Sequence, residues 1–250
     1  MNVKNLISNS FFLLAVCFTA LFFHSCSKND VTDAPINTSI DEEFGKHLKE
    51  LTIFDEANEN SAVLLVGSDD ASILNMWTAE NFTLVPVKEG ETTKEAVDAF
   101  FAKNAPIAND EAEVDEDALE DTGASISTKL LSTSLVDGVA KVVLHSTSPY
   151  DEDMRGWTYQ THYSDYQGQA GENTGTVTCN VYGQNFWHRG YYGIQYKKYS
   201  SSSWSTVVSE WKQIKRGDTD EYSKTPCYVM KARRKYKGSN NNSVLVEFEY

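Results

Sequence analysis

The chain has 250 residues, with 22 basic and 36 acidic side chains, a formal net charge of −14 at pH 7 and 4 cysteines. This excess of acidic side chains argues against nucleic acid as a partner, because a protein needs a basic surface to bind the phosphates. The length suffices for one large or two small domains with hydrophobic cores. Acidic side chains predominate before residue 150, whereas the two signs are nearly balanced after it. We therefore predict two domains that meet near this residue.

Residues 1–25 have the features of a secretory signal peptide. Lys4 provides a cationic start, residues 11–23 are almost entirely apolar, and Ser25 is a small residue at the end of the segment. The apolar run is shorter than the ~20 residues that a transmembrane helix needs. We therefore expect this segment to direct export and to be removed.

The residues around Cys26 extend this prediction. Phe23-His24-Ser25-Cys26 resembles a bacterial lipobox, in which the cysteine is acylated and becomes the new N-terminus. Ser27-Lys28-Asn29-Asp30 is similar to the charged stretch after the cysteine in Bacteroidota surface lipoproteins. The resemblance is confined to the leader. It implies a lipid anchor in the outer membrane, with the protein at the cell surface or otherwise on the periplasmic face. An ordinary signal peptide or an uncleaved N-terminal anchor is the alternative.

Three helix signals follow a polar stretch, residues 26–40, which we expect to be a flexible tether. Ser39, the run Ser68-Asp69-Asp70 and Thr92 each resemble an N-cap before an amphipathic pattern. They predict that residues 41–148 form a small α+β domain, although residues 51–54 could equally begin a strand.

Two further signals lie within the same predicted domain. The eight carboxylates of residues 109–121 repel one another, which favours an exposed acidic loop. Asp137-Gly138 separates two strand-like segments, residues 126–135 and 139–145, and this arrangement predicts a β-hairpin.

Residues 150–250 are predicted to form an all-β antiparallel sandwich. Tyr and Trp alternate with polar residues there, as in strands that are buried on one face. The stretch is loosely similar to an immunoglobulin-like sandwich, with Cys179 on an early strand and Cys227 at the start of a late one. A jelly-roll-like sandwich is the alternative. The expected strands are residues 157–163, 176–182, 191–199, 205–215, 228–236 and 243–250.

The lipoprotein resemblance also bears on the cysteines. Cys17 would leave with the leader and Cys26 would carry lipid, so that Cys179 and Cys227 remain. In an oxidising envelope we expect these two to form a disulfide, which would contribute about 4 kcal/mol in the chain-entropy model. Two buried free thiols are the alternative.

Aromatic side chains in Gly- and Ser-rich segments form the first candidate ligand site. Exposed rings offer flat platforms on which sugar rings or a protein partner can pack, although packing beneath a loop is an alternative role. The candidates are Trp187, His188, Tyr191, Tyr192 and Trp204.

Basic residues near the C-terminus form the second candidate site. Strand alternation places Lys231, Arg233, Lys235 and Lys237 on one face. Such a stripe could meet an acidic polymer or the acidic N-terminal half, and a solvated outer face of the sandwich is the alternative.

The sequence contains no spacing typical of a zinc site, a nucleophile elbow, a phosphate loop or an EF-hand. We expect the histidines to be isolated from one another and the acidic block to be a solvated loop. The alternatives are metal ligation by His145, His162 and His188, and calcium binding by the acidic block. We therefore expect no cofactor, no bound metal and no enzymatic activity. The favoured function is a membrane-anchored, non-enzymatic module that binds a glycan or a protein. A structural subunit of an envelope complex and a hydrolase are the alternatives, and neither the ligand nor the oligomeric state follows from the sequence.

Overall fold

A computed structural model describes residues 44–103, 120–149, 156–167, 175–183, 190–237 and 244–250. The chain divides into two compact units, Met1–Thr38 and Ser39–Tyr250, and every described residue belongs to the second unit. The leader, Cys26, the whole predicted tether and residues 109–119 of the acidic segment lie outside the described residues. Among those described, no helix combines the length and apolar character needed to cross a membrane.

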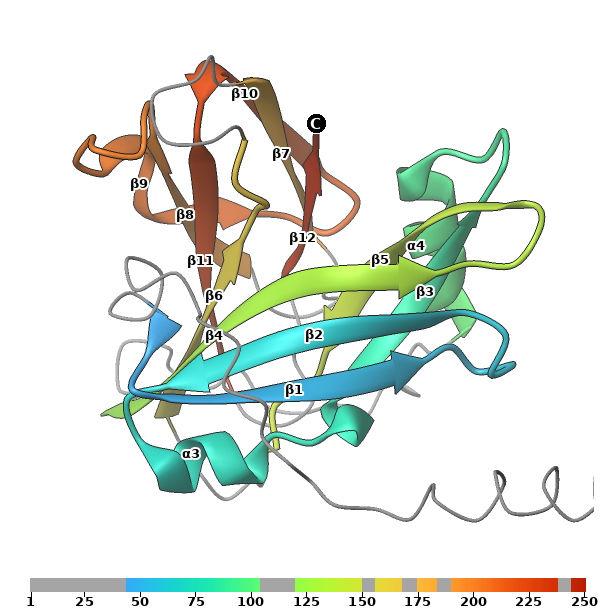
Figure 1. Cartoon of the computed structure of the whole chain (residues 1–250), viewed down its shortest axis with the longest axis horizontal. Coiled ribbons are helices and arrows are strands. Elements are labelled where there is room, and N and C mark those ends of the chain that lie inside the picture. The colour runs from blue at the N-terminus through green and yellow to red at the C-terminus, as the bar shows by residue number, and fades with distance from the viewer. Residues whose placement is uncertain (1–43, 104–119, 150–155, 168–174, 184–189, 238–243) are drawn as a thin grey trace, which may run out of the picture. The chain divides into compact units, whose positions relative to one another are not determined.

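A seven-stranded sheet organises the second unit (Figure 1). Its strands are β1 (His47–Phe54), β2 (Ser61–Ser68), β4 (Glu120–Ser134), β6 (Gly156–Tyr163), β8 (Gly190–Lys197), β9 (Ser205–Ile214) and β11 (Val229–Lys237). Their order is β1-β2-β4-β6-β11-β8-β9. Neighbouring strands are antiparallel, except that β4 and β6 run parallel.

Two smaller antiparallel sheets pack on one face of this sheet. One pairs β3 (Phe82–Lys88) with β5 (Val139–Ser146). The other places β7 (Gly175–Gly183) between β10 (Thr219–Cys227) and β12 (Val244–Glu249). The described chain is therefore mostly β-structure in several largely antiparallel sheets, as expected of a β-sandwich.

Two hydrophobic cores lie between the layers, and each follows from the period-two alternation of its strands. The first joins β1, β2 and β4 to β3 and β5, through Ile53, Leu64, Val66, Phe82, Leu84, Ile126 and Val142. The second joins β8, β9 and β11 to β7 and β12, through Val177, Val181, Tyr192, Ile194, Val208, Met230 and Val246. Burial of each large aliphatic side chain contributes about 1.5–3 kcal/mol.

The predicted domain boundary near residue 149 is wrong. β4, from the N-terminal half, pairs with β6, from the C-terminal half, through Glu120–Lys129 and Gly156–Tyr163. One hydrogen-bonded sheet thus contains strands from both predicted domains, and residues 39–250 form one compact unit. A separate α+β domain is not evident, because its helices pack on sheets of this common unit.

Two of the three predicted helices are confirmed. The first, α3 (Ala71–Met76), begins after Asp70, whose Oδ1 accepts a hydrogen bond of 2.7 Å from the Ser72 backbone N–H. The second, α4 (Thr93–Lys103), begins after the predicted N-cap Thr92, which forms a capping box with Glu95. Glu95 Oε2 accepts from the Thr92 backbone N–H at 2.9 Å, and Thr92 Oγ1 accepts from the Glu95 backbone N–H at 3.3 Å. These contacts satisfy amide groups that lack intrahelical partners.

The helix predicted after Ser39 is wrong over its described part. Residues 47–54 form β1, and every one of them has a partner on β2. The spacing of Leu48 and Leu51 resembled a helical face, but pairing with β2 provides the backbone hydrogen bonds and buries Ile53 in the first core. Tertiary pairing therefore overrides the local pattern.

The predicted hairpin at Asp137-Gly138 has the right turn but the wrong pairing. Gly138 adopts a positive φ of 84°, and the Val139 N–H donates to the Val136 carbonyl across the turn. The flanking strands β4 and β5 nevertheless belong to different sheets, because β4 pairs with β2 and β6 whereas β5 pairs with β3. The turn therefore carries the chain from one layer of the sandwich to the other.

Candidate functional site

Alternate residues of β11 place a row of cations on the face of the seven-stranded sheet that points away from the cores. Ala232 and Arg234 point inward and are 0% and 1% exposed. Lys231, Arg233 and Lys235 point outward and are partly exposed. Residues two apart on a strand are about 6.8 Å apart. Three members of the predicted basic stripe therefore share one face, and the side chain of the fourth, Lys237, lies outside the described residues.

The strands on either side of β11 contribute aromatic rings to the same face. Tyr163 and Tyr159 of β6 pair with Lys231 and Lys235, and Tyr191 of β8 pairs with Lys235 from the other side. Directly paired residues project to the same side of a sheet. The register of three strands, distant in sequence, therefore interleaves cations with rings.

Trp204, which directly precedes β9, lies against the first cation of the row. The Lys231 Nζ is 4.0 Å from the centroid of the Trp204 ring, and the Lys197 Nζ is 5.0 Å from the same ring. The Tyr163 ring is 6.3 Å from Trp204 at an interplanar angle of 68°. Each cation–ring contact contributes about 0.5–1 kcal/mol at exposed sites.

Trp211 of β9 joins the other two cations. The Arg233 guanidinium carbon lies 4.7 Å from the Tyr159 ring and 5.3 Å from the Trp211 ring. The Lys235 Nζ lies 4.8 Å from the Tyr191 ring and 5.4 Å from Trp211. We call this surface the cation–aromatic face, and it comprises Lys197, Lys231, Arg233, Lys235, Tyr159, Tyr163, Tyr191, Trp204 and Trp211.

Arg233 is also oriented by a carboxylate. Its Nη1 lies 3.2 Å from Glu210 Oε2 of β9. Gly193, the partner of Arg233 on β8, makes room for this contact, because a Cβ at Gly193 would lie 2.4 Å from Glu210 Cγ. A glycine at this position therefore lets the Glu210 side chain cross β8 to reach the arginine.

One end of the cation–aromatic face continues into a pocket of about 580 Å³, here called the polar pocket. The hydroxyl-bearing residues Ser125, Ser127 and Thr161 line it from β4 and β6, and Lys231 and Arg233 line it from β11. Hydroxyl groups both donate and accept hydrogen bonds. The volume falls within the range of about 300–1,000 Å³ that is typical of small-ligand sites.

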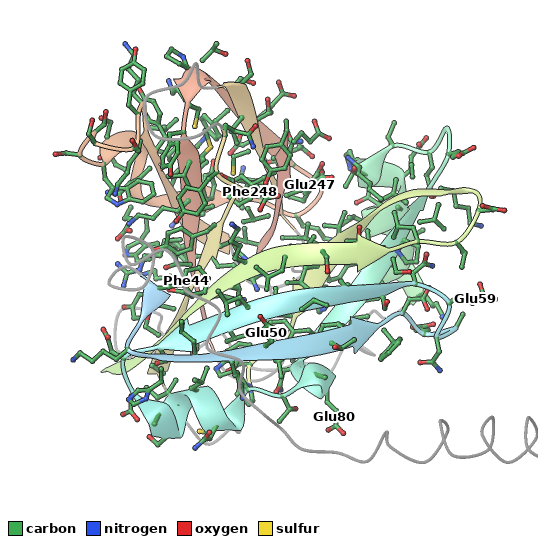
Figure 2. The ribbon with its side chains drawn as sticks, viewed as in Figure 1. Phe44, Glu50, Glu59, Glu80, Glu247 and Phe248 are labelled. Carbon is green, nitrogen blue, oxygen red and sulfur yellow. The ribbon has the colours of Figure 1, made fainter. Side chains whose placement is uncertain are left out.

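Another wall of the polar pocket comes from the residues just before β1 and from the end of β2. Phe44 packs on Tyr163 with ring centroids 5.0 Å apart, and Figure 2 shows Phe44 beside the first strands. Gly67 allows the backbone to approach closely there, because a Cβ would lie 2.3 Å from the Phe44 carbonyl oxygen. Asp69 and Asp70 also line this wall. The pocket therefore combines hydroxyl, aromatic, cationic and carboxylate groups.

The predicted aromatic candidates divide into three groups. Tyr191 and Trp204 lie on the cation–aromatic face, as described above. Tyr192 does not, because it is 0% exposed in the second core and its hydroxyl donates to Asp220. The prediction for Tyr192 is therefore wrong, since adjacent strand residues point to opposite faces. Trp187 and His188 lie outside the described residues.

The predicted disulfide is wrong as well. Cys179 and Cys227 are free thiols, and both are 0% exposed in the second core. Cys179 pairs with Tyr222 of β10, whereas Cys227 pairs with Gly175. Gly175 precedes Cys179 by a strand length of roughly 13 Å, but a disulfide requires Cα atoms within about 7 Å. Burial raises the pKa of both thiols, that of Cys227 to about 11.

A second cavity, of about 380 Å³, lies between β5 and β12. Leu64, Leu130 and Leu144 line its apolar part, and Figure 2 shows two further lining residues, Glu247 and Phe248, on β12. Lys141 forms an ion pair of 2.6 Å with Glu247 at this cavity. Tyr163, a member of the cation–aromatic face, also lines this cavity.

Buried polar side chains connect the two layers beside this cavity. Ser146 Oγ donates to Gln160 Oε1 at 2.9 Å, and both contact the Arg234 guanidinium. His162, which lines the cavity, has its Nδ1 2.8 Å from Thr128 Oγ1. Burial and the nearby Arg234 lower the pKa of His162 well below its ordinary value, so the ring is neutral.

The described histidines do not gather around a metal site. His145 packs against Phe100 and Phe101, with ring centroids 5.3 and 5.2 Å away, whereas His162 contacts Thr128. Within the described ranges, no group of three or more His, Cys, Asp or Glu side chains is arranged to hold a metal ion.

Tyr159, Trp211 and the serine-rich floor of the polar pocket were not predicted as site residues. Tyr159 could have been found, because strand alternation aligns it with Thr161 and Tyr163. No local signal could have placed Trp211 beside Lys235, because that contact depends on β8 lying between β9 and β11.

The comparisons with known proteins do not supply a function for this face. No protein-family model matches the chain. No similar sequence was found among curated proteins. The functional argument therefore depends on the geometry of the site.

Proposed function

We propose that the chain is a membrane-anchored surface lipoprotein whose β-sandwich is a non-enzymatic, glycan-binding module. The immunoglobulin-like resemblance supports a scaffold role, in which a rigid sandwich presents a binding surface. The lipobox resemblance at Cys26 supports attachment to the outer membrane. The adjoining polar stretch supports this arrangement as a tether.

One observation carries the glycan-binding proposal. The hydroxyl-lined polar pocket adjoins a row of aromatic rings on a rigid sheet. Sugars present hydroxyl groups at their edges and apolar C–H groups on their faces. Ser127 and Thr161 can exchange hydrogen bonds with sugar hydroxyls, whereas the partly exposed rings of Tyr159 and Trp211 offer apolar surface. A protein partner would need a larger apolar centre than these partly charged residues provide.

Binding of the purified full chain to a panel of immobilised glycans tests the proposal. Replacement of Trp211 by Ala should weaken binding about tenfold, because a large, partly buried ring is lost from the face. Phe54→Ala is the matched control, since Phe54 is an exposed ring, 53% accessible, at the opposite end of β1 from the polar pocket. Far-ultraviolet circular dichroism and thermal unfolding establish that each variant is folded. If no glycan binds, or if both variants lose binding equally, the proposal is wrong.

A further inference from the structure

The charge on the cation–aromatic face differs from that of the chain as a whole. The chain has a net charge of −14, yet Lys197, Lys231, Arg233 and Lys235 all lie on this face. Within the described ranges, Glu210 contacts this row through its ion pair with Arg233. Such a local excess of positive charge, on a surface that also carries rings, favours an anionic ligand.

Aromatic rings hold these cations in place. Lys231 lies over Trp204, Arg233 over Tyr159, and Lys235 over Tyr191, all with cation–centroid distances of 4.0–4.8 Å. A cation held against a ring loses part of its hydration and much of its mobility. It therefore attracts an anion more strongly, and at a lower entropic cost, than a freely moving surface lysine does.

The arrangement also extends beyond the polar pocket. Lys231 and Arg233 line the pocket, whereas Lys235, the next cation along β11, is not among its lining residues. The rings of Tyr191 and Trp211 accompany Lys235. A single sugar in the pocket cannot use this outer part of the face, but a chain of sugars can.

The guanidinium of Arg233 suits a carboxylate in particular. Its five N–H donors form a planar fork that matches a carboxylate, and the contact with Glu210 involves one nitrogen of that fork, Nη1. Arg233 lies between the two lysines of the row, at a spacing of about 6.8 Å from each. A repeating carboxylate along the ligand would meet each cation in turn.

We infer that the ligand of the cation–aromatic face is a carboxylated polysaccharide that lies along β11. One sugar occupies the polar pocket, and the following sugars place their carboxylates against Arg233 and Lys235. Their apolar faces pack on Tyr159, Tyr191 and Trp211. This inference rests on the proposed glycan-binding function and specifies its ligand class.

Three probes separate charge from sugar recognition: polygalacturonate, its fully methyl-esterified form, and poly-L-glutamate. The ester retains the sugar and removes the charge, whereas poly-L-glutamate retains the charge and removes the sugar. Calorimetric titration of the full chain should show that polygalacturonate binds at least about tenfold more tightly than either control. Its affinity should also fall as the ionic strength rises from about 0.05 to about 0.5 M, because salt screens the exposed charges.

Single-charge variants identify where the polymer lies. Lys235→Gln should weaken polygalacturonate binding about tenfold and should weaken binding of the ester by a smaller factor, because the ester carries no charge for Lys235 to meet. Lys224→Gln is the matched control, since Lys224 also lies over a ring, that of Tyr196 at 5.7 Å, but on β10. It should bind like the unmodified protein. Thermal unfolding of both variants identifies any loss caused by misfolding.

The outcomes distinguish this inference from the proposed function. If the ester binds as tightly as the acid, the inference is wrong and glycan binding stands. If poly-L-glutamate binds as tightly as polygalacturonate, both are wrong, because charge alone accounts for binding. If none of the three probes binds, the inference is wrong and the glycan panel decides the proposed function. Equal losses in Lys235→Gln and Lys224→Gln would also overturn the inference.

Discussion

Two histidines, His162 inside the sandwich and the part-buried His145 beneath α4, should make the protein less stable as the pH falls. His162 is 8% exposed and lies beside Thr128, and His145 packs against two phenylalanine rings of α4. Burial, and secondarily the positive charge of Arg234, lower the pKa of His162 well below its ordinary value and that of His145 to about 3. Both rings are therefore neutral in the folded protein at ordinary pH.

The direction of the effect follows from where the protons bind. An unfolded histidine has a pKa of about 6.5, so below this pH the unfolded chain takes up protons that the folded chain excludes. The stabilisation from each neutral ring is complete above that pH and is lost as the pH falls through it. At about pH 5 the free energy of unfolding should be lower by about 2 kcal/mol for each histidine, or about 4 kcal/mol for both.

Urea denaturation between about pH 8 and about pH 5 measures this loss. His162→Gln and His145→Gln should each reduce the pH-dependent loss by about half, whatever their effect on stability at high pH. His47→Gln is the matched control, because His47 is exposed on β1, and it should retain the full loss.

Carboxylates contribute little in this pH range. Burial acts to raise the pKa of Asp55, but hydrogen bonds from Asn60 and Glu59 lower it overall. A carboxylate whose pKa is lowered stabilises the fold above the unfolded pKa of about 4, and this stabilisation is lost only as the pH falls through that value. If the His162 and His145 variants lose as much stability as the unmodified protein between pH 8 and pH 5, the histidines are not the cause and the reasoning is refuted.

Three further predictions concern the packing, the thiols and the anchor. Gly67→Ala should lower the free energy of unfolding, measured by chemical denaturation, by about 1–3 kcal/mol, because the added Cβ would overlap the Phe44 carbonyl oxygen. Gly175→Ala is the control, because its added Cβ would lie 3.4 Å from the nearest atom, Gln167 Oε1. It should change the free energy of unfolding by less than about 0.5 kcal/mol. Cys179 and Cys227 should not react with a thiol reagent in the native protein and should both react after denaturation without a reductant; absence of reaction in the denatured protein would indicate a disulfide. Replacement of Cys26 by Ser should prevent acylation and release the protein from the membrane fraction in cell fractionation, and continued anchoring of this variant would contradict the lipoprotein proposal.

Several elements could be predicted because their signals are local. The capping box of Thr92 and Glu95 marked the start of α4, and alternation of polar and apolar residues identified strands such as β7 and β11. β10 was not predicted, because it contains few apolar residues and every second position from Thr219 to Thr225 is exposed. Its place depends on pairing with β7, which its own residues do not reveal.

The sequence by itself determined that Lys231, Arg233 and Lys235 share a face, because successive side chains of any strand point to opposite sides. It also contained the lipobox-like residues on which the proposed anchor depends. Only the tertiary structure decided which rings accompany those cations, because Tyr159, Tyr191 and Trp211 reach β11 through the order of four strands. The same strand registers separated Cys179 from Cys227 and joined the two predicted domains into one sheet. Pairing between distant strands is selected by the hydrogen bonds and apolar burial of the whole sandwich, and no local pattern contains that information.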